Sequence, residues 1–153
     1  MYENKTVDGV ATIKNVLNIG PNYVTAMYPG DKNYTFMANV TEFDISKTNT
    51  SLTVVATPSV LVFGNITRIT VTMVNVTAGK VLIEVNNYNY SVDINSNGIA
   101  TLDLTLPVGE YTPKAYYLGD LEHKASNSTG NTFEVIKLNT TMGITVKDID
   151  YGK

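Results

Sequence analysis

The chain has 153 residues, a net charge of −3, a single histidine and no cysteine. The mild negative charge and the lone arginine, Arg68, argue against nucleic-acid binding, which needs a basic face. Without cysteine there can be no disulfide and no Cys–His zinc site. No run of about 18 apolar residues is present, so no membrane span is predicted in this segment.

Alternating apolar and polar residues, the pattern of half-buried β-strands, run through the sequence in chain order. Residues 1–47 predict about three strands, with an inward face made by Val10, Ile13, Val16, Tyr23, Phe43 and Ile45. The strands predicted next are residues 52–56, 61–63, 68–74, 81–85, 88–94, 99–106, 111–117 and 132–137. A last strand is predicted over residues 141–151.

The turns between these strands are marked by glycine, proline and asparagine. Asn97-Gly98 predicts a hairpin, after which residues 99–106 pair back, and Asn86-Asn87 predicts another turn. About seven antiparallel strands in about 90 residues, without a convincing helix, predict an all-β, immunoglobulin-like sandwich.

The sequence also repeats itself with a period of about 90 residues, which indicates a tandem array of domains. Residues 8–13 return as 97–102, residues 28–31 as 117–120, residues 47–54 as 137–144, and Phe43 as Phe133. The repeat predicts three parts: the C-terminal half of one module (1–47), a complete module (48–138) and the first strand of a following module (139–153). Two alternatives follow: a segment of a longer array, or a chain whose tail adds as a strand to the half module of the next copy.

Sequons of the form Asn-x-Ser/Thr are more frequent than composition predicts. Nine of the 17 asparagines lie in sequons, where the Ser and Thr content predicts about three. They are Asn4, Asn33, Asn39, Asn49, Asn65, Asn75, Asn89, Asn127 and Asn139. The excess favours a glycosylated protein of the outer surface, although asparagine-rich turns beside threonine-rich strands would also generate sequons.

A family resemblance rests on the spacing of Gly20, Tyr23, Tyr28, Gly30-Asp31 and Tyr34, which is similar to the bacterial Ig-like group 3 domains. The run Asp148-Ile149-Asp150-Tyr151-Gly152 resembles module openings in adhesin-like surface proteins of methanogenic archaea. The resemblance implies Ig-like modules in series as a stalk outside the cell wall. The complete module departs from the pattern in two places. Residues 121–124, after Gly119-Asp120, lack a counterpart of Tyr34, and residues 59–64 lack counterparts of Asp148 and Asp150. These departures argue against one chemical site shared by every repeat.

Candidate site residues have mainly structural interpretations. Asp31 and Asp120, after Gly30 and Gly119, are expected to accept backbone hydrogen bonds and fix turns. Tyr111, and Tyr23 at the matching place, are expected to form tyrosine corners.

Other chemistry has weaker support. Asp148 and Asp150 are weak candidates for a calcium site, which needs six to eight oxygens. The lone His123 has no partner set for zinc or for a catalytic triad. Lys80 and Asn131 are a candidate isopeptide pair, although the predicted first strand has no lysine. No cofactor is expected.

The sequence therefore predicts a non-enzymatic structural segment of an extracellular cell-surface protein, with neighbouring modules or head-to-tail copies as partners. Surface glycans or another cell are further expected partners. A carbohydrate-binding module, for which Tyr88, Tyr90, Tyr116 and Tyr117 are candidates, and a filament subunit are the alternatives.

Overall fold

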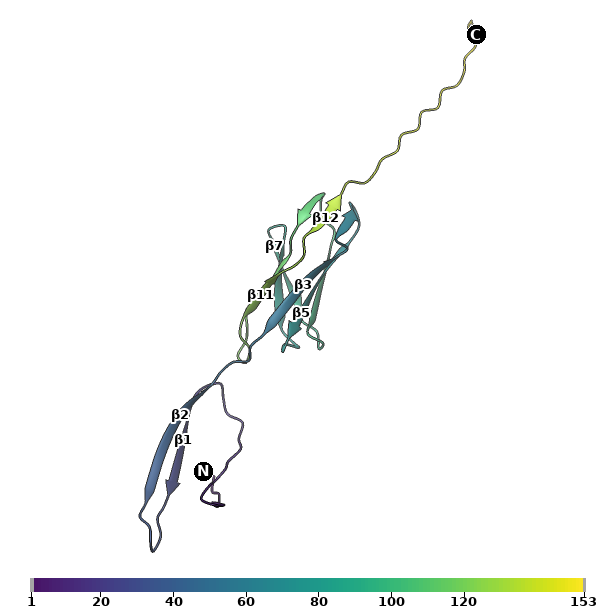
Figure 1. Ribbon diagram of the computed structural model, residues 1–153. Helices are drawn as coiled ribbons and strands as arrows, with labels where there is room; N and C mark the ends of the chain where they lie inside the picture. Colours follow the sequence, from purple (N-terminus) through teal and green to yellow (C-terminus); the bar gives the residue numbers. More distant parts are fainter. Residues whose placement is uncertain (1, 153) are drawn as a thin grey trace. The chain divides into compact units, whose positions relative to one another are not determined.

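The computed structural model describes residues 2–152, and within that range it consists of strands and loops without an α-helix (Figure 1). The chain divides into two compact units: residues 2–48 with 120–124, and residues 49–119 with 125–152. No helix in the described residues is long and apolar enough to cross a membrane. The predicted all-β sandwich class is confirmed.

The second unit is a sandwich of antiparallel sheets. One sheet has the order β3-β5-β8 and the other β11-β10-β6-β7. The strands of the first are β3 (Ser51–Thr57), β5 (Thr67–Val74) and β8 (Ile99–Leu104). Those of the second are β6 (Lys80–Val85), β7 (Tyr88–Asp93), β10 (Lys114–Tyr117) and β11 (Ser126–Thr129). A third sheet, β4-β12-β9, contains β4 (Val60–Val62), β9 (Gly109–Tyr111) and β12 (Phe133–Ile136).

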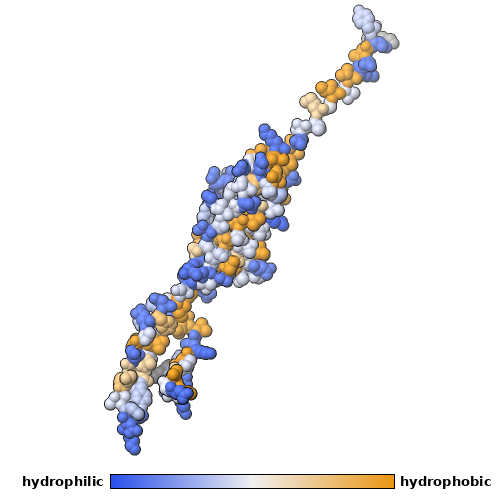
Figure 2. Space-filling model, in the orientation of Figure 1, coloured by the Kyte–Doolittle hydropathy of each residue, from blue (hydrophilic) through white to orange (hydrophobic). Residues whose placement is uncertain are grey.

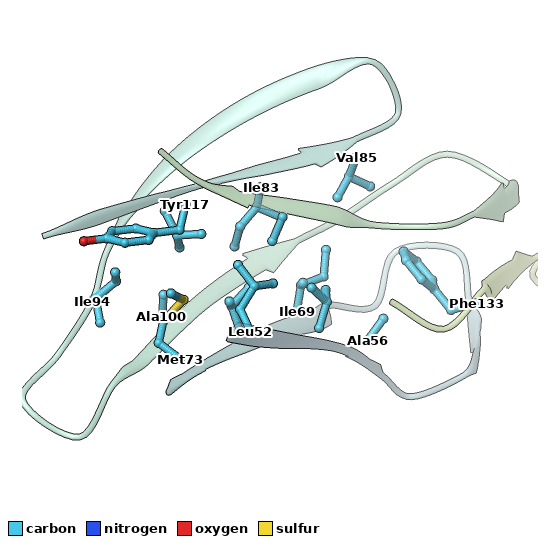
Figure 3. Close-up of a cluster of buried hydrophobic side chains, with 14 of the residues drawn as sticks. Leu52, Ala56, Ile69, Met73, Ile83, Val85, Ile94, Ala100, Tyr117 and Phe133 are labelled. Atoms are coloured by element: carbon cyan, nitrogen blue, oxygen red, sulfur yellow. The ribbon is translucent and has the colours of Figure 1, made fainter. Parts of the chain in front are cut away.

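The core lies between the sheets because alternate side chains of each strand point inward (Figure 3). In β5 the buried positions are Ile69, Val71 and Met73, and in β6 they are Val81, Ile83 and Val85. Phe133 of β12 lies against Tyr111 of β9, with ring centroids 5.6 Å apart. Burying each such side chain contributes about 1.5–3 kcal/mol relative to leaving it exposed.

Several predicted pairings are wrong in detail. β8 pairs with β5 and lies in a different sheet from β7, so Asn97-Gly98 marks a crossover between sheets. The hairpin turn is Asn86-Asn87 between β6 and β7, where both residues have positive φ. β4 pairs with β12 in parallel instead of antiparallel. The predicted strand 111–117 is split into β9 and β10, and β11 was not predicted.

The first unit contains a β-hairpin of β1 (Gly20–Tyr28) and β2 (Met37–Ile45). Residues 2–19 add a single bridge, Val7 to Val10, in place of a third strand. By the repeat, residues 10–15 correspond to β8, which pairs with β5 in the second unit.

The inward face predicted for residues 1–47 is not buried in the structure. Val10, Ile13, Val16, Tyr23 and Phe43 are exposed, and Ile45 is half-buried. Residues 137–150 form no strand in the structure, although they carry the predicted last strand. A strand needs a partner for its ladder hydrogen bonds, and the counterpart of this segment, β3, obtains them from β5.

Candidate functional site

The first Gly-Asp turn closes the β1–β2 hairpin. Oδ1 of Asp31 accepts hydrogen bonds from the amides of Asn33 (2.8 Å) and Tyr34 (2.9 Å), and its own amide donates to the carbonyl of Tyr34. The hydroxyl of Tyr28 donates to Oδ2. The Tyr28 hydroxyl and the Asn33 amide hold the pKa of the Asp31 carboxyl below its usual value. The carboxylate is therefore committed to the turn.

Gly30 is needed for this geometry. Its φ is +85°, and a Cβ there would lie 3.0 Å from the Phe36 amide nitrogen and the Tyr34 carbonyl oxygen.

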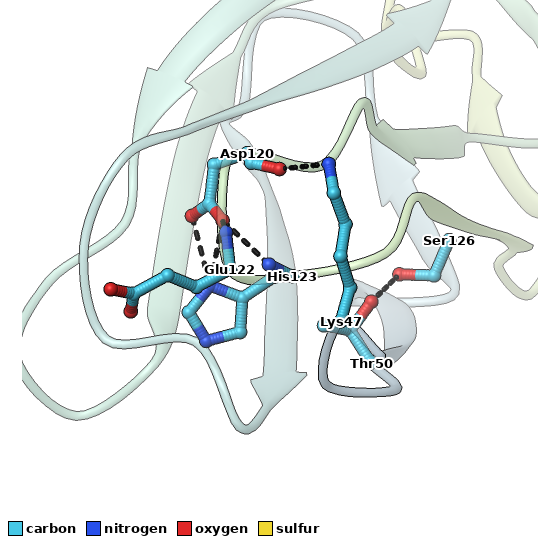
Figure 4. A network of polar contacts seen from close by, with 6 residues as sticks. All are labelled: Lys47, Thr50, Asp120, Glu122, His123 and Ser126. Atoms are coloured by element: carbon cyan, nitrogen blue, oxygen red, sulfur yellow. Dashed lines mark hydrogen bonds and ion pairs between the residues drawn. The ribbon is translucent and has the colours of Figure 1, made fainter. Parts of the chain in front are cut away.

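The second Gly-Asp turn has the same backbone pattern. Oδ1 of Asp120 accepts from the amides of Glu122 (2.8 Å) and His123 (2.7 Å), and Gly119 has a φ of +81°. The ring Nδ1 of His123 lies 2.9 Å from both carboxylate oxygens (Figure 4). The lone histidine therefore occupies the turn position that Tyr34 occupies in the other copy, and its side chain contacts the aspartate of its own turn.

This second turn also holds the chain segment that follows β2. Nζ of Lys47 donates to the carbonyl of Asp120 (2.5 Å), as Figure 4 shows. The Thr48 amide donates to the carbonyl of Glu122 (2.8 Å), and the Lys124 amide donates to the carbonyl of Thr48 (2.9 Å). Three hydrogen bonds therefore fix the two residues before the sandwich begins.

The two candidate corner tyrosines lie in different settings. The Tyr111 hydroxyl donates to the carbonyl of Pro107 (2.9 Å), four residues upstream, which ties the start of β9 to the preceding turn. Tyr23 lies within β1 opposite Glu42, and its side chain is exposed. The tyrosine-corner geometry is thus present at Tyr111.

The nine sequon asparagines share one property: all are exposed. They are distributed over both units, in strands, turns and the C-terminal segment: Asn4, Asn33, Asn39, Asn49, Asn65, Asn75, Asn89, Asn127 and Asn139. Each could accept an N-linked glycan without unfolding a strand core.

The metal and isopeptide candidates are not assembled into sites. Among residues 2–152 no group of three or more His, Asp or Glu side chains could hold a metal ion. Asp148 and Asp150 lie in the C-terminal segment outside any strand. Lys80 pairs with Asp93 at 2.7 Å, whereas Asn131 bonds to Ala56, so the two have different partners.

Two polar features were missed by sequence reasoning. The side chain of Asn131 accepts from the Ala56 amide (2.8 Å) and donates to the Ala56 carbonyl (3.0 Å), so it replaces a backbone partner at the edge of β3. Arg68 and Asp103 form a two-pronged ion pair between β5 and β8. The Arg68 hydrogen bonds lower the pKa of Asp103. Opposite charges on neighbouring strands could have indicated this pair, but nothing in the sequence marks Asn131.

One hollow of the described surface is lined by residues of β6, β9 and β10, including Glu84, Glu110 and Lys114. Another lies at the end of the hairpin, between Tyr28, Tyr34, Thr35, Phe36 and Met37. Its lining is aromatic and apolar, so it suits an apolar side chain better than a charged ligand.

Comparison with known proteins adds little to this description. Neither the protein-family models nor the curated proteins compared with the chain match it. Among solved structures the chain is similar to the endo-beta-1,4-mannanase from Thermotoga petrophila, with 14% identity and a TM-score of 0.45. The match covers 58% of this chain and 20% of that chain, so this chain spans about a fifth of that protein's length. A likeness this low carries no argument about function. The all-β fold is compatible with a structural or binding domain.

Proposed function

We propose that the chain is a segment of a structural stalk or fibre in an extracellular, adhesin-like surface protein built from tandem Ig-like modules. The observation that carries the proposal is the repeat. Its shared positions build turns and a core: Gly30 and Gly119, Asp31 and Asp120, Phe43 and Phe133. The positions that could do chemistry differ between copies, as His123 and Tyr34 do. A module that keeps the same turn and core residues in each copy, while its polar side chains vary, suits the role of a spacer.

The link between modules supports the same proposal. The stretch 46–50 connects β2 to β3 without glycine or proline. Hydrogen bonds from the 120–124 turn fix the backbone at Thr48. We expect a semi-rigid array, because few backbone torsions remain free in so short a link.

The exposed sequons support an outer-surface location. We propose that the protein is glycosylated outside the cell, as an archaeal surface glycoprotein would be. Mass spectrometry of protein isolated from its native host should show glycan masses on several of the nine sequons. Unmodified peptides at all nine would contradict the glycoprotein proposal.

The spacer proposal is tested by imaging. A protein with several copies of the 48–138 module joined by the natural link should appear in rotary-shadowed images as a thin beaded rod. A matched protein with a flexible Gly/Ser link in place of residues 46–50 should give bent and collapsed particles. Identical compact particles from both proteins would contradict a spacer.

The second candidate function, carbohydrate binding, has less structural support. Of the tyrosines proposed for it, Tyr117 is buried in the core and Tyr116 donates to Glu84. Tyr88 is exposed on β7, with Tyr90 half-buried two residues on. Saturable glycan-array binding that Tyr88→Ala abolishes would favour this function over a pure spacer.

A further inference from the structure

The four-stranded sheet of the sandwich has one open edge. Its order is β11-β10-β6-β7, so β11 and β7 are its edge strands (Figure 1). β11 lies against β3, where the hydroxyl oxygens of Ser126 and Thr50 are 2.8 Å apart. Among the described strands, β7 pairs with β6 alone. The open edge of this sheet is therefore β7.

The strand register shows which backbone groups of β7 point away from β6. The Ile94 amide donates to the Gly79 carbonyl (2.8 Å), one step beyond the last pair of the β6–β7 ladder. Hydrogen-bonded and non-hydrogen-bonded pairs alternate along an antiparallel ladder, so every second residue of β7, counted back from Ile94, bonds to β6. The amides and carbonyls of Asn89, Ser91 and Asp93 consequently point outward, to the side on which a further strand could add.

The sequence of this edge favours pairing with another strand. Residues 88–92, Tyr-Asn-Tyr-Ser-Val, contain no charge and no proline, and tyrosine and valine favour strands. An unpaired edge of this kind invites a strand from another chain. Hydrophobic and polar residues are intermixed over the sandwich in Figure 2, so the edge is distinguished by its strand pairing and not by its hydropathy.

Both edges of the facing sheet, β3-β5-β8, carry a group that hinders such pairing. On β3 the Asn131 side chain bonds to the amide (2.8 Å) and the carbonyl (3.0 Å) of Ala56. On β8 the outward positions are counted in the same way from the hydrogen bond between Met73 and Gly98. One of them is Asp103, and a charged side chain is a common protection of an edge strand. The two outward positions in the first half of β7 carry no charge and no such covering side chain.

β7 instead carries a sequon, residues 89–91, at these two outward positions. The Asn89 side chain is exposed and lies on the outer face of the sheet beside Glu84, because Ile83 and Val85 of β6 point into the core. A strand added at this edge would place a side chain about 4.5–5.5 Å from Asn89, measured between Cβ atoms. A glycan on Asn89 would occupy that space.

We propose that an N-linked glycan on Asn89 covers the open edge of β7 and prevents this sheet from pairing with the same edge of another molecule. The inference rests on the proposed glycosylation and assigns a role to one of the nine sequons. Asn127, the sequon asparagine of β11, lies on an edge that β3 already covers. A glycan there has no such role, so Asn127 supplies a matched control.

The first test is the occupancy of Asn89 in protein isolated from its native host. Peptide mass spectrometry should show a glycan on this residue. A bare Asn89 beside glycosylated sequons elsewhere overturns the inference and leaves the glycoprotein proposal standing. Nine bare sequons overturn both.

The second test compares variants of the full chain made in a host that glycosylates sequons. Ser91→Ala and Ser91→Lys both remove the sequon and keep Asn89. In sedimentation velocity, Ser91→Ala should rise with concentration toward twice the mass of the glycosylated natural chain, since two identical edges pair as a closed dimer. Ser91→Lys places a charge at the outward position and should not rise. Asn127→Gln should behave as the natural chain.

Amide hydrogen exchange locates the contact. In the associated Ser91→Ala chain, the outward amides of Asn89 and Asp93 should exchange about tenfold more slowly than in Ser91→Lys, because they donate to the added strand. Equal masses for the Ser91→Ala and natural chains would overturn the role of the Asn89 glycan. Association without protection of these two amides would overturn it as well.

Discussion

At the scale of single residues, Asp31 and Asp120 keep the same backbone contacts in both copies of the repeat but have different side-chain partners. Both carboxylates accept hydrogen bonds from the backbone amides of the second and third residues after the aspartate. The remaining oxygens differ in partner, a tyrosine hydroxyl at Asp31 and an imidazole at Asp120. The constant part of each site is therefore the turn itself.

The Asp31 turn should respond to acid. Hydrogen bonds from Tyr28 and from the amides of Asn33 and Tyr34 lower the pKa of Asp31 below 3.8. A lowered folded pKa means that the carboxylate contributes stability above about pH 3.8, and that this contribution is lost as the pH falls through the lowered pKa. Carboxyl NMR titration should show the low value. Tyr28→Phe should move it back toward 3.8, and an unchanged value would contradict the assignment.

The Tyr111 hydroxyl is the second residue-scale test. Tyr111→Phe removes the bond to the Pro107 carbonyl and should lower the free energy of unfolding of the sandwich by about 0.5–1.5 kcal/mol in urea titrations. The matched change Tyr23→Phe, at an exposed position in the hairpin, should leave the sandwich within about 0.5 kcal/mol of the natural chain. Equal effects from both changes would argue against a corner at Tyr111.

At the scale of strands, hydrophobic alternation was enough to predict most elements. β3, β5 and β6 were found because their buried residues alternate without interruption. β11 was missed because its sequence, Ser126–Thr129, is entirely polar and pairs through its backbone with β10. The candidate turns at Asp31 and Asp120 were predictable from Gly-Asp, because that chemistry is local.

Pairing partners were less predictable than strands. A turn sequence such as Asn97-Gly98 shows that the chain reverses, but the next strand can join either sheet of a sandwich. Here the Gly98 carbonyl accepts a hydrogen bond from the Met73 amide at the end of β5. This hydrogen bond places β8 beside β5, in the same sheet. That contact is long-range, so local sequence does not reveal it.

Gly98 therefore makes a sharp test of the crossover. Its φ is +75°, and a Cβ would lie 2.9 Å from the carbonyl oxygens of Met73 and Val76. Gly98→Ala should destabilise the sandwich by more than about 2 kcal/mol. At Gly79, φ is +98° and the space is open, so Gly79→Ala should cost about 1 kcal/mol. Thermal or urea unfolding measures both, and equal costs would contradict the close approach at Gly98.

At the scale of the whole molecule, corresponding residues of the two repeat copies differ in how deeply their side chains are buried. Phe133 is 1% exposed in the core of the second unit, whereas its counterpart Phe43 in the hairpin is 37% exposed. The local sequences agree, so the difference in burial comes from long-range packing. Hydrophobic alternation does not reveal which of two such faces is packed.

The difference in burial between Phe133 and Phe43 can be measured by replacing each of them with alanine. Phe133→Ala should cost the sandwich about 3–5 kcal/mol, because it leaves a cavity in a packed core. Phe43→Ala should leave the unfolding of the sandwich within about 0.5 kcal/mol of the natural chain when both are measured in dilute solution. A large loss at Phe43 would mean that its side chain is covered.

The parallel pairing of β4 with β12 has a mechanical consequence. β4 is the second strand of the sandwich along the chain, after β3, and β12 is the last. Tension on the two ends would pull these parallel strands past each other, so their hydrogen bonds would be strained together instead of opening one after another. We expect the sandwich to resist stretching through its ends more strongly than a pull that peels β12 away, a comparison that single-molecule force measurements with different attachment points would make.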